Sequence, residues 1–418
     1  MKILVLSPNI PSQKKMSVGY CGGGWISSLI YHLKQINNIH LGVGFVTEQI
    51  RDNFENDGIK YFPIYKASKS RLGKIFYYWR GYKSDIFNKS VTDSISSIIE
   101  CFKPDIIHIF GTESDLPYIV EKTSVPCVIH IQGILSSFQY SYFPMGIGKM
   151  NLMLPTNVKE FWLRNGLIFN FNRMKLAAER EITHIKRCKN FIGRTDWDNH
   201  VVKMYNSAVN YFHVDELLRL PFYEAKKWSY NRINKNIIVS TLSPTIYKGL
   251  DIILKTAEVL KEEGHEFEWH VIGCSNVDRV VKIIEDAVEI EANNVNVYFQ
   301  GIQTADELVN TLLGSTMYVH PSYCDNSPNS LAEAQFLGIP TIATNIGGIP
   351  TLMNHCYEWM VSPTDIHTLA IKILKLQNLL QEGNYKNDIY PIVIERHNPD
   401  KIINSLLSTY KTLLSSSK

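Results

Sequence analysis

The sequence predicts an α/β protein made of two doubly wound, Rossmann-like domains that face each other across a cleft. Short apolar runs alternate along the chain with stretches whose apolar residues recur at helical spacing, which is the pattern of parallel sheets covered by helices. The chain has 418 residues, and this length suits two domains of roughly 200 residues each. A polar stretch without strong periodicity, 222–236, is the predicted linker. It separates a first domain, 1–221, from a second, 237–395.

Composition and charge exclude several classes of protein. Hydrophobic residues make up 45% of the chain and charged residues 20%, as in globular proteins, and a net charge of +3 is too small to indicate nucleic-acid binding. The seven cysteines are scattered and form no C-x-x-C pair, which favours a reducing compartment and argues against a structural zinc site. The apolar run 3–6 is too short for a signal peptide, and no run approaches the roughly 18 residues of a membrane span. We therefore expect a cytoplasmic protein.

A glycine-rich stretch follows the first predicted strand, Ile3 to Leu6. Gly22, Gly23 and Gly24 stand directly before an apolar-periodic helix that begins at Trp25. Glycines between a strand and a helix let backbone N–H groups approach a phosphate or another ligand, although three glycines also suit a flexible turn. The pattern is neither G-x-G-x-x-G nor a Walker loop, so nicotinamide or ATP binding has little support.

Two further segments of the first domain have an unusual composition. Residues 66–89 combine seven lysines and arginines with six aromatic residues and one acid, Asp85. This pattern fits a surface helix on anionic lipid headgroups, but it also fits an ordinary helix with aromatic residues in the core and a solvated basic face.

The region 134–174 is rich in Phe, Tyr, Met and Trp, and Gly146, Gly148 and Pro155 interrupt its helical periodicity. We interpret it as a mobile, partly apolar insertion that faces an acceptor.

Two strands are predicted at 105–110 and 126–132, each ending in a polar turn or glycine. His130 and Gln132 lie on the same face of the second strand, because side chains alternate along a strand. A lone histidine in an apolar strand is commonly a core residue, and this is the alternative to a site role for His130.

The second domain is predicted to open with a buried strand at 237–242, followed by a loop and an amphipathic helix from Leu250. Lys248 stands at the start of that helix, where the helix dipole disfavours a positive charge. A lysine in this position therefore indicates function rather than stability. Strands at 269–273 and 295–301 continue the alternation.

The stretch 320–350 is the most informative part of the chain. It predicts a polar loop, a helix at 330–337, a Gly-Ile-Pro stop, a strand at 341–344 and a turn at Gly347-Gly348, which together form a βαβ crossover. Ligands bind at the carboxyl ends of such strands, and the N-terminus of the helix favours phosphate. Asp325 and Glu333, with seven residues between them, are both expected beside this ligand-binding edge of the sheet. The alternative for Glu333 is a capping box with Ser330.

These residues resemble the Glu-x7-Glu signature of the retaining glycosyltransferases of the GT-B fold grouped as family 4, with Asp325 in place of the first glutamate. The in-register turns Gly338-Ile339-Pro340 and Gly347-Gly348-Ile349-Pro350 complete the likeness. The resemblance implies a GT-B fold whose final segment, 396–418, crosses back over the first domain. It also implies that Asp325 contacts hydroxyls of the donor sugar, Glu333 contacts the ribose, and Lys248 binds the diphosphate.

The resemblance assigns further residues to the site, and at two further positions this chain departs from the family's pattern. Gly22, Gly23 and Gly24 would face the donor, and the loop and helix start would bind it through Asn326, Ser327, Pro328, Asn329 and Ser330. Gln132 stands where many members have a histidine near the reacting sugar, with His130 two residues earlier, so we treat Asp325, His130 and Gln132 as the catalytic candidates. Thr241 stands where members have a second diphosphate-binding residue, an arginine.

The implied function is that of a hexosyltransferase-type enzyme that transfers a sugar from a UDP-, GDP- or ADP-linked donor to a glycan or lipid-linked acceptor, with retention. No metal or other cofactor is expected, because fixed cations offset the charge of the leaving diphosphate. A basic-aromatic segment and an apolar insertion in the acceptor-side domain lead us to expect peripheral binding at the inner face of the membrane and a role in building capsule, O-antigen or exopolysaccharide. The alternative is a catalytically silent nucleotide-sugar-binding or membrane-organising protein of the same fold.

Overall fold

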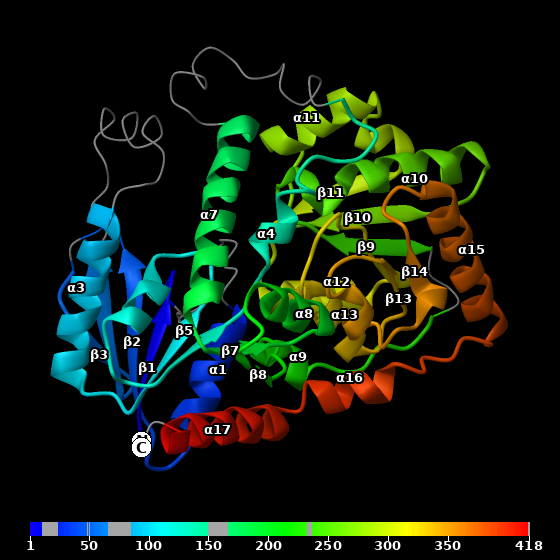
Figure 1. The fold of residues 1–418 in the computed structure, drawn as a ribbon. Helices are drawn as coiled ribbons and strands as arrows, with labels where there is room; N and C mark the ends of the chain where they lie inside the picture. Colours follow the sequence, from blue (N-terminus) through cyan, green and yellow to red (C-terminus); the bar gives the residue numbers. More distant parts are fainter. Residues whose placement is uncertain are drawn as a thin grey trace.

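Two parallel sheets, one in each half of the chain, organise the molecule (Figure 1). The computed structural model describes residues 1–10, 24–47, 49, 51–65, 85–148, 166–231 and 236–416. Gly22, Gly23, most of the basic-aromatic segment 66–89 and the insertion residues 149–165 lie outside this description.

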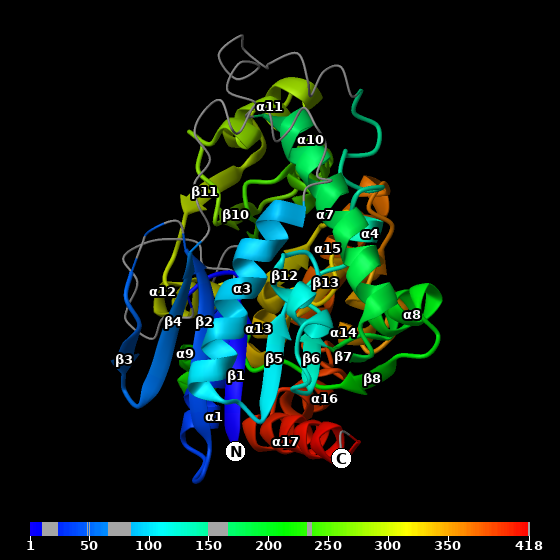
Figure 2. The same ribbon diagram turned by 60° about the vertical axis from the view of Figure 1, so that its left-hand side comes forward.

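The first sheet has the strand order β3-β4-β2-β1-β5-β6-β7-β8, which can be followed across Figure 2, and only the edge strand β3 is antiparallel. Its strands are β1 (Lys2–Ser7), β2 (His40–Thr47), β3 (Phe54–Asn56), β4 (Ile59–Tyr65), β5 (Ile106–Phe110), β6 (Cys127–His130), β7 (Asn190–Gly193) and β8 (Asn210–His213). The helical segments are α1 (Gly24–Lys34), α3 (Asp85–Phe102), η1 (Leu116–Glu121), α4 (Leu135–Phe138), α7 (Leu167–Arg187) and α8 (Asp196–Tyr205). Separate hydrophobic cores on its two faces explain why β1 and β5 are apolar without alternation.

The second sheet is parallel, with the order β11-β10-β9-β12-β13-β14. Its strands are β9 (Ile237–Thr241), β10 (Glu268–Ile272), β11 (Val297–Gly301), β12 (Met317–His320), β13 (Thr341–Thr344) and β14 (Met360–Val361). The helical segments are α9 (Leu220–Glu224), η2 (Ile246–Lys248), α10 (Leu250–Glu262), α11 (Arg279–Val288), η3 (Ala292–Val295), α12 (Ala305–Leu313), α13 (Asn329–Leu337), α14 (Ile349–Leu352), η4 (Tyr357–Trp359), α15 (Ile366–Glu382) and α16 (Tyr390–Arg396). The strand order reverses between β9 and β12, and in sheets of this kind ligands bind beside the carboxyl ends of the strands at such a point.

The chain passes between the two halves earlier than the predicted linker. Leu218 and Phe222 are buried in the core of the second half, so the crossing segment precedes 222–236. The described part of the region 134–174 also differs from the expected mobile insertion, because Tyr142, Ile147 and Leu167 are buried in that same core. Apolar side chains in this region therefore dock the first half onto the second.

The last helix, α17 (Pro399–Ser416), returns to the first half, where Figure 1 shows it in red beneath that sheet. Ile402, Leu406 and Tyr410 are buried in the same core as β1 and α1. The Tyr410 hydroxyl lies 2.5 Å from Nδ1 of His108 on β5.

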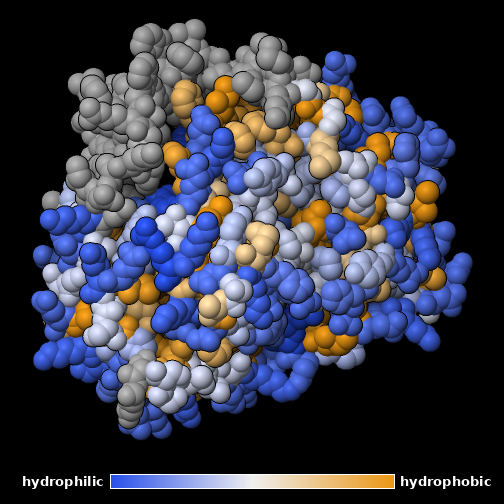
Figure 3. Space-filling model, viewed as in Figure 1, coloured by the Kyte–Doolittle hydropathy of each residue, from blue (hydrophilic) through white to orange (hydrophobic). Residues whose placement is uncertain are grey.

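On the face drawn in Figure 3, hydrophilic side chains predominate and hydrophobic ones are scattered among them. Among the helices of the described ranges, none combines the length and apolar character that crossing a membrane requires.

Candidate active site

Lys248 and Asp325 form an ion pair at the carboxyl edge of the second sheet. They follow the neighbouring strands β9 and β12, so their loops meet at this edge. The Lys248 Nζ lies 2.5 Å from Oδ2 of Asp325, and His320 Nε2 lies 3.1 Å from the same oxygen. Gly249, which has a φ of 81°, allows the close approach, because a Cβ there would collide with the carbonyl oxygen of Pro321.

Lys248 lies in the turn η2 and not in the first turn of α10. Its proximity to Asp325 supplies a structural reason for a lysine here, alongside the functional reason predicted from the sequence. His320, at the end of β12, was not predicted as a site residue. The signal available for it was its place at a strand end five residues before Asp325.

Charge at this centre is fixed by the three neighbours. Burial opposes ionisation of Asp325, but Lys248 and the hydrogen bond to His320 outweigh it and hold the pKa of the carboxyl well below its usual range. Burial lowers the pKa of His320, although Asp325 partly opposes this effect. At neutral pH the centre therefore holds a carboxylate, an ammonium group and a neutral imidazole.

Glu333 is buried and held by Arg219, the N-cap residue at which α9 begins after the chain has crossed from the first domain. The Glu333 side chain is 2% exposed, and Arg219 donates from Nε to Oε1 at 2.6 Å and from Nη2 to Oε2 at 2.7 Å. The capping-box alternative is wrong, because the N-cap of α13 is Pro328 and no side chain caps the helix. Arg219 was missed, since nothing in its local sequence distinguishes it from any other arginine.

Gly24, the one glycine of the predicted triplet within the described residues, lies against this arginine. A Cβ at Gly24 would stand 2.9 Å from Cδ and 3.0 Å from Cγ of Arg219. The end of the glycine stretch, the crossing segment and α13 therefore meet at one place.

The catalytic prediction for His130 is not supported by its surroundings. The imidazole is 1% exposed, packs edge-on against Trp25 and has Nδ1 3.2 Å from Nε2 of His108. Burial, together with His108 and Arg194, lowers its pKa well below the ordinary value. These features favour the alternative, a core histidine.

Gln132 is half-buried just beyond the end of β6. Its backbone carbonyl accepts a hydrogen bond of 3.1 Å from Nη2 of Arg194, and no hydrogen-bond partner is found among the described residues for its own Nε2. This nitrogen is itself buried, and a catalytic role for Gln132 stays a prediction.

Asn326 and Ser327 join the two halves of the molecule, which differs from their predicted donor contacts. Thr195 donates to Oδ1 of Asn326 at 2.7 Å, and Nδ2 of Asn326 donates to Asp198 at 2.9 Å. Ser327 donates to Glu216 at 2.9 Å, and Glu216 also pairs with the buried Arg194. All of these side chains are less than 10% exposed, so they are committed to the contact between the domains.

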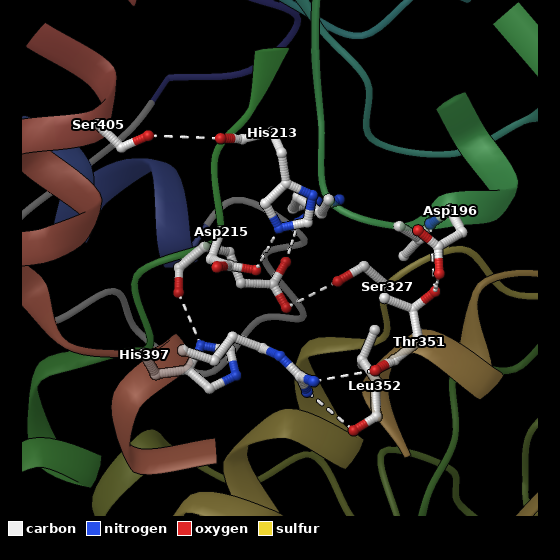
Figure 4. Close-up of polar contacts among 12 residues, drawn as sticks. Asp196, His213, Asp215, Ser327, Thr351, Leu352, His397 and Ser405 are labelled. Atoms are coloured by element: carbon white, nitrogen blue, oxygen red, sulfur yellow. Dashed lines mark hydrogen bonds and ion pairs between the residues drawn. The ribbon is translucent and has the colours of Figure 1, made fainter. Parts of the chain in front are cut away.

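The same contact continues toward the C-terminus, as Figure 4 shows for the labelled residues around Ser327, Thr351 and His397. The Asp196 backbone N–H donates to Thr351 at 3.1 Å, and Nδ1 of His397 lies 2.9 Å from the carbonyl oxygen of Glu216. Asn329 and Ser330, also predicted to bind donor, are half-buried in the first turn of α13. Their backbone N–H groups belong to a helix N-terminus, where an anion is favoured.

Comparison with known proteins agrees with this arrangement. Residues 223–414 match the family model described as "Glycosyl transferases group 1". The "Amylovoran biosynthesis glycosyltransferase AmsK" of Erwinia amylovora is 25% identical over 170 residues, 38% of this chain and 38% of that protein. "Protein CapJ" of Staphylococcus aureus is 30% identical over 149 residues, 35% of each chain. The alignments thus span less than two fifths of these relatives.

Solved structures match over almost the full length. Sucrose-phosphate synthase from Thermosynechococcus elongatus aligns with a TM-score of 0.71 at 12% identity, covering 99% of both chains. Anabaena Alr3699/HepE in complex with UDP aligns with a TM-score of 0.62 at 15% identity, covering 99% of this chain and 100% of that one. The chain therefore has the GT-B fold, and its residues 223–414 are similar to the group 1 glycosyltransferases.

Proposed function

We propose that this protein is a glycosyltransferase that moves a sugar, with retention of anomeric configuration, from a nucleoside-diphosphate sugar to a glycan or lipid-linked acceptor. The observation that carries the proposal is the grouping of Lys248, Asp325 and Glu333 around the carboxyl edge of the sheet in the matched domain. In this proposal the three residues bind the diphosphate, the sugar and the ribose.

The charges of the site suit the departure of a diphosphate. Negative charge develops on the diphosphate as the sugar leaves, and the Lys248 ammonium with the N-terminus of α13 stabilises it. The Asp325 side chain makes its described hydrogen bonds, to Lys248 and His320, through Oδ2, so the proposal assigns its Oδ1 to hydroxyls of the sugar. A structural relative, HepE, is known with UDP and glucose, which makes UDP-sugars the first donors to test.

The proposed acceptor belongs to a surface polysaccharide pathway. The matched relatives include proteins named for amylovoran and, in Escherichia coli, colanic acid biosynthesis. Capsule, O-antigen or exopolysaccharide intermediates are therefore the acceptor class that we propose.

The decisive experiment has two stages. UDP-, GDP- and ADP-sugars are first screened for thermal stabilisation, because a bound ligand raises stability by RT ln(1 + [L]/Kd). The stabilising donor is then offered with lipid-linked acceptors, and NMR of the product reports the anomer. Binding without turnover on any acceptor would favour the catalytically silent alternative, and an inverted anomer would exclude retention.

We also propose that transfer needs no metal ion, with Lys248 supplying positive charge to the diphosphate. EDTA should leave the transfer rate unchanged. Strong inhibition that Mn²⁺ or Mg²⁺ reverses would overturn this assignment.

Peripheral membrane binding through the segment 66–89 completes the proposal, and its support comes from sequence composition alone. Each lysine or arginine near an anionic surface contributes about 1 kcal/mol of binding free energy, which salt weakens. The protein should sediment with anionic vesicles at low salt and be released at high salt. Replacement of Lys69, Arg71, Lys74 and Arg80 by glutamine should abolish sedimentation, and unchanged sedimentation would leave the segment as an ordinary solvated surface.

A further inference from the structure

Arg219 links the two halves of the molecule at the proposed ribose-binding residue. It lies on the crossing segment between β8 and α9, and its guanidinium makes two parallel hydrogen bonds of 2.6 and 2.7 Å to Glu333 on α13. The Glu333 side chain is 2% exposed, whereas that of Arg219 is 29% exposed. The pair therefore has a buried carboxylate and a guanidinium that borders solvent.

A two-point contact of this kind fixes the orientation of a carboxylate. The planar guanidinium sets both the position and the rotation of the carboxyl plane, which a lysine cannot do through one ammonium group. An ionised carboxylate offers about four lone-pair sites, and the arginine occupies two of them. The remaining two are held in defined directions and suit a pair of neighbouring hydroxyls, which is what a ribose presents.

We propose that Arg219 is the positioning residue for ribose recognition: it orients Glu333 from the start of α9, where the chain enters the second domain, so that Glu333 accepts hydrogen bonds from the ribose hydroxyls of the donor. This inference rests on the proposed function, which supplies the nucleotide. Recognition of the ribose thus depends on a residue 114 positions away in the chain, at the crossing between the domains.

Gly24, the last glycine of the triplet, leaves the space that the Arg219 side chain needs to reach Glu333. The stem of Arg219 passes so close to Gly24 that a Cβ would stand 2.9 Å from its Cδ. Because Glu333 fixes the far end of the side chain, the stem has little room to move aside. A methyl group at this position should therefore displace the guanidinium from Glu333.

The test compares UDP, GDP and ADP with their 2′-deoxy forms by titration calorimetry on the full chain. The wild type should prefer the ribose form of its nucleotide by about tenfold, the effect of one hydrogen bond to a charged group. Arg219→Lys, Arg219→Gln and Gly24→Ala should reduce this preference to about twofold or less, while the affinity for the 2′-deoxy form stays near that of the wild type. Arg187→Lys, which alters an exposed arginine paired with Glu121, is the matched control and should keep the full preference.

These measurements distinguish a failure of the positioning role of Arg219 from a failure of the proposed glycosyltransferase function. Retention of the full preference in Arg219→Lys and Arg219→Gln would overturn the positioning role alone, as would an equal loss of affinity for both nucleotide forms. A wild type that binds none of the nucleotides would overturn the proposed function and the inference with it. Thermal unfolding of each variant identifies a folding defect, and Arg219→Lys, which keeps the positive charge beside Glu333, is the variant that decides.

Discussion

At the scale of single residues, the charge of Asp325 at the centre of the site depends on its two neighbours, Lys248 and His320. Asp325 is 8% exposed, and a buried carboxylate is costly unless a cation and hydrogen bonds compensate for lost hydration. Lys248 supplies the cation and His320 a hydrogen bond. Lys248 therefore has two separable effects, on stability and on binding of the diphosphate.

Lys248→Ala should separate these effects. Removing one partner of a buried pair leaves the other charge uncompensated, so we expect the free energy of unfolding to fall by about 3 kcal/mol in urea titrations. Affinity for a nucleoside diphosphate should fall more than affinity for the nucleoside, because only the former carries phosphates.

The double variant Lys248→Ala with Asp325→Asn is the control for this prediction. It should regain most of the stability, since no charge is left unpaired, but it should not regain the preference for the diphosphate. Equal losses for nucleoside and diphosphate would show that Lys248 is purely structural.

At the scale of elements, α17 belongs to the core of the first domain although it ends the chain. Leu406 is fully buried among residues of β1 and α1, and Tyr410 contacts His108. The amphipathic pattern of 399–414 predicted the helix, and the resemblance predicted its return across the first domain. Helix α17 thereby packs on the first domain, while α16, which directly precedes it, packs on the second through Val393.

Leu406→Ala should lower the free energy of unfolding by about 3 kcal/mol, because it removes buried methyl groups and leaves a cavity. Ser408→Ala, on the exposed face of the same helix, should change it by less than about 0.5 kcal/mol. Urea titrations measure both. Equal effects of the two substitutions would mean that α17 does not contribute to this core.

At the scale of the whole molecule, buried neutral histidines set the response to acid. Burial lowers the pKa of His108 and His397 to about 3, with Arg396 adding to the effect at His397, and burial lowers the pKa of His184 to about 4. It lowers those of His130 and His320 as well. An unfolded histidine has a pKa near 6.5, so between about pH 4 and 6.5 the unfolded chain binds more protons than the folded one. These histidines therefore make the free energy of unfolding rise with pH across this window, and their contribution levels off above it.

Lowering the pH from 7.5 to 5.5 should reduce the free energy of unfolding by about 1 kcal/mol for each of His108, His184 and His397. Glu113 opposes the trend, since burial raises its pKa to about 7. Glu181 and Asp251, whose pKa burial also raises, and His213, whose pKa its hydrogen bond to Asp215 raises, oppose it as well. Urea titrations at the two pH values provide the measurement. Equal stability at both would mean that the folded protein binds these protons as readily as the unfolded chain does.

The sequence by itself determined the local elements and the residue types of the site. Apolar runs and glycine turns predicted the strand 341–344 with the bounds that β13 has, because backbone periodicity is encoded within a few neighbouring residues. The spacing of Asp325 and Glu333 likewise predicted two carboxylates in the strand-loop-helix unit that follows β12, since strand, loop and helix are consecutive in the chain.

Only the tertiary structure decided which side chains these residues meet. Glu333 pairs with Arg219, and Asn326 pairs with Asp198 across 128 residues, because the chain crosses between domains before these partners come together. Strand alternation placed His130 and Gln132 on one face but did not reveal that Trp25 covers the histidine. Periodicity specifies the face of a helix or strand on which a side chain lies. The residues that pack over that side chain, and its ion-pair partners, depend on how elements distant in the chain pack together.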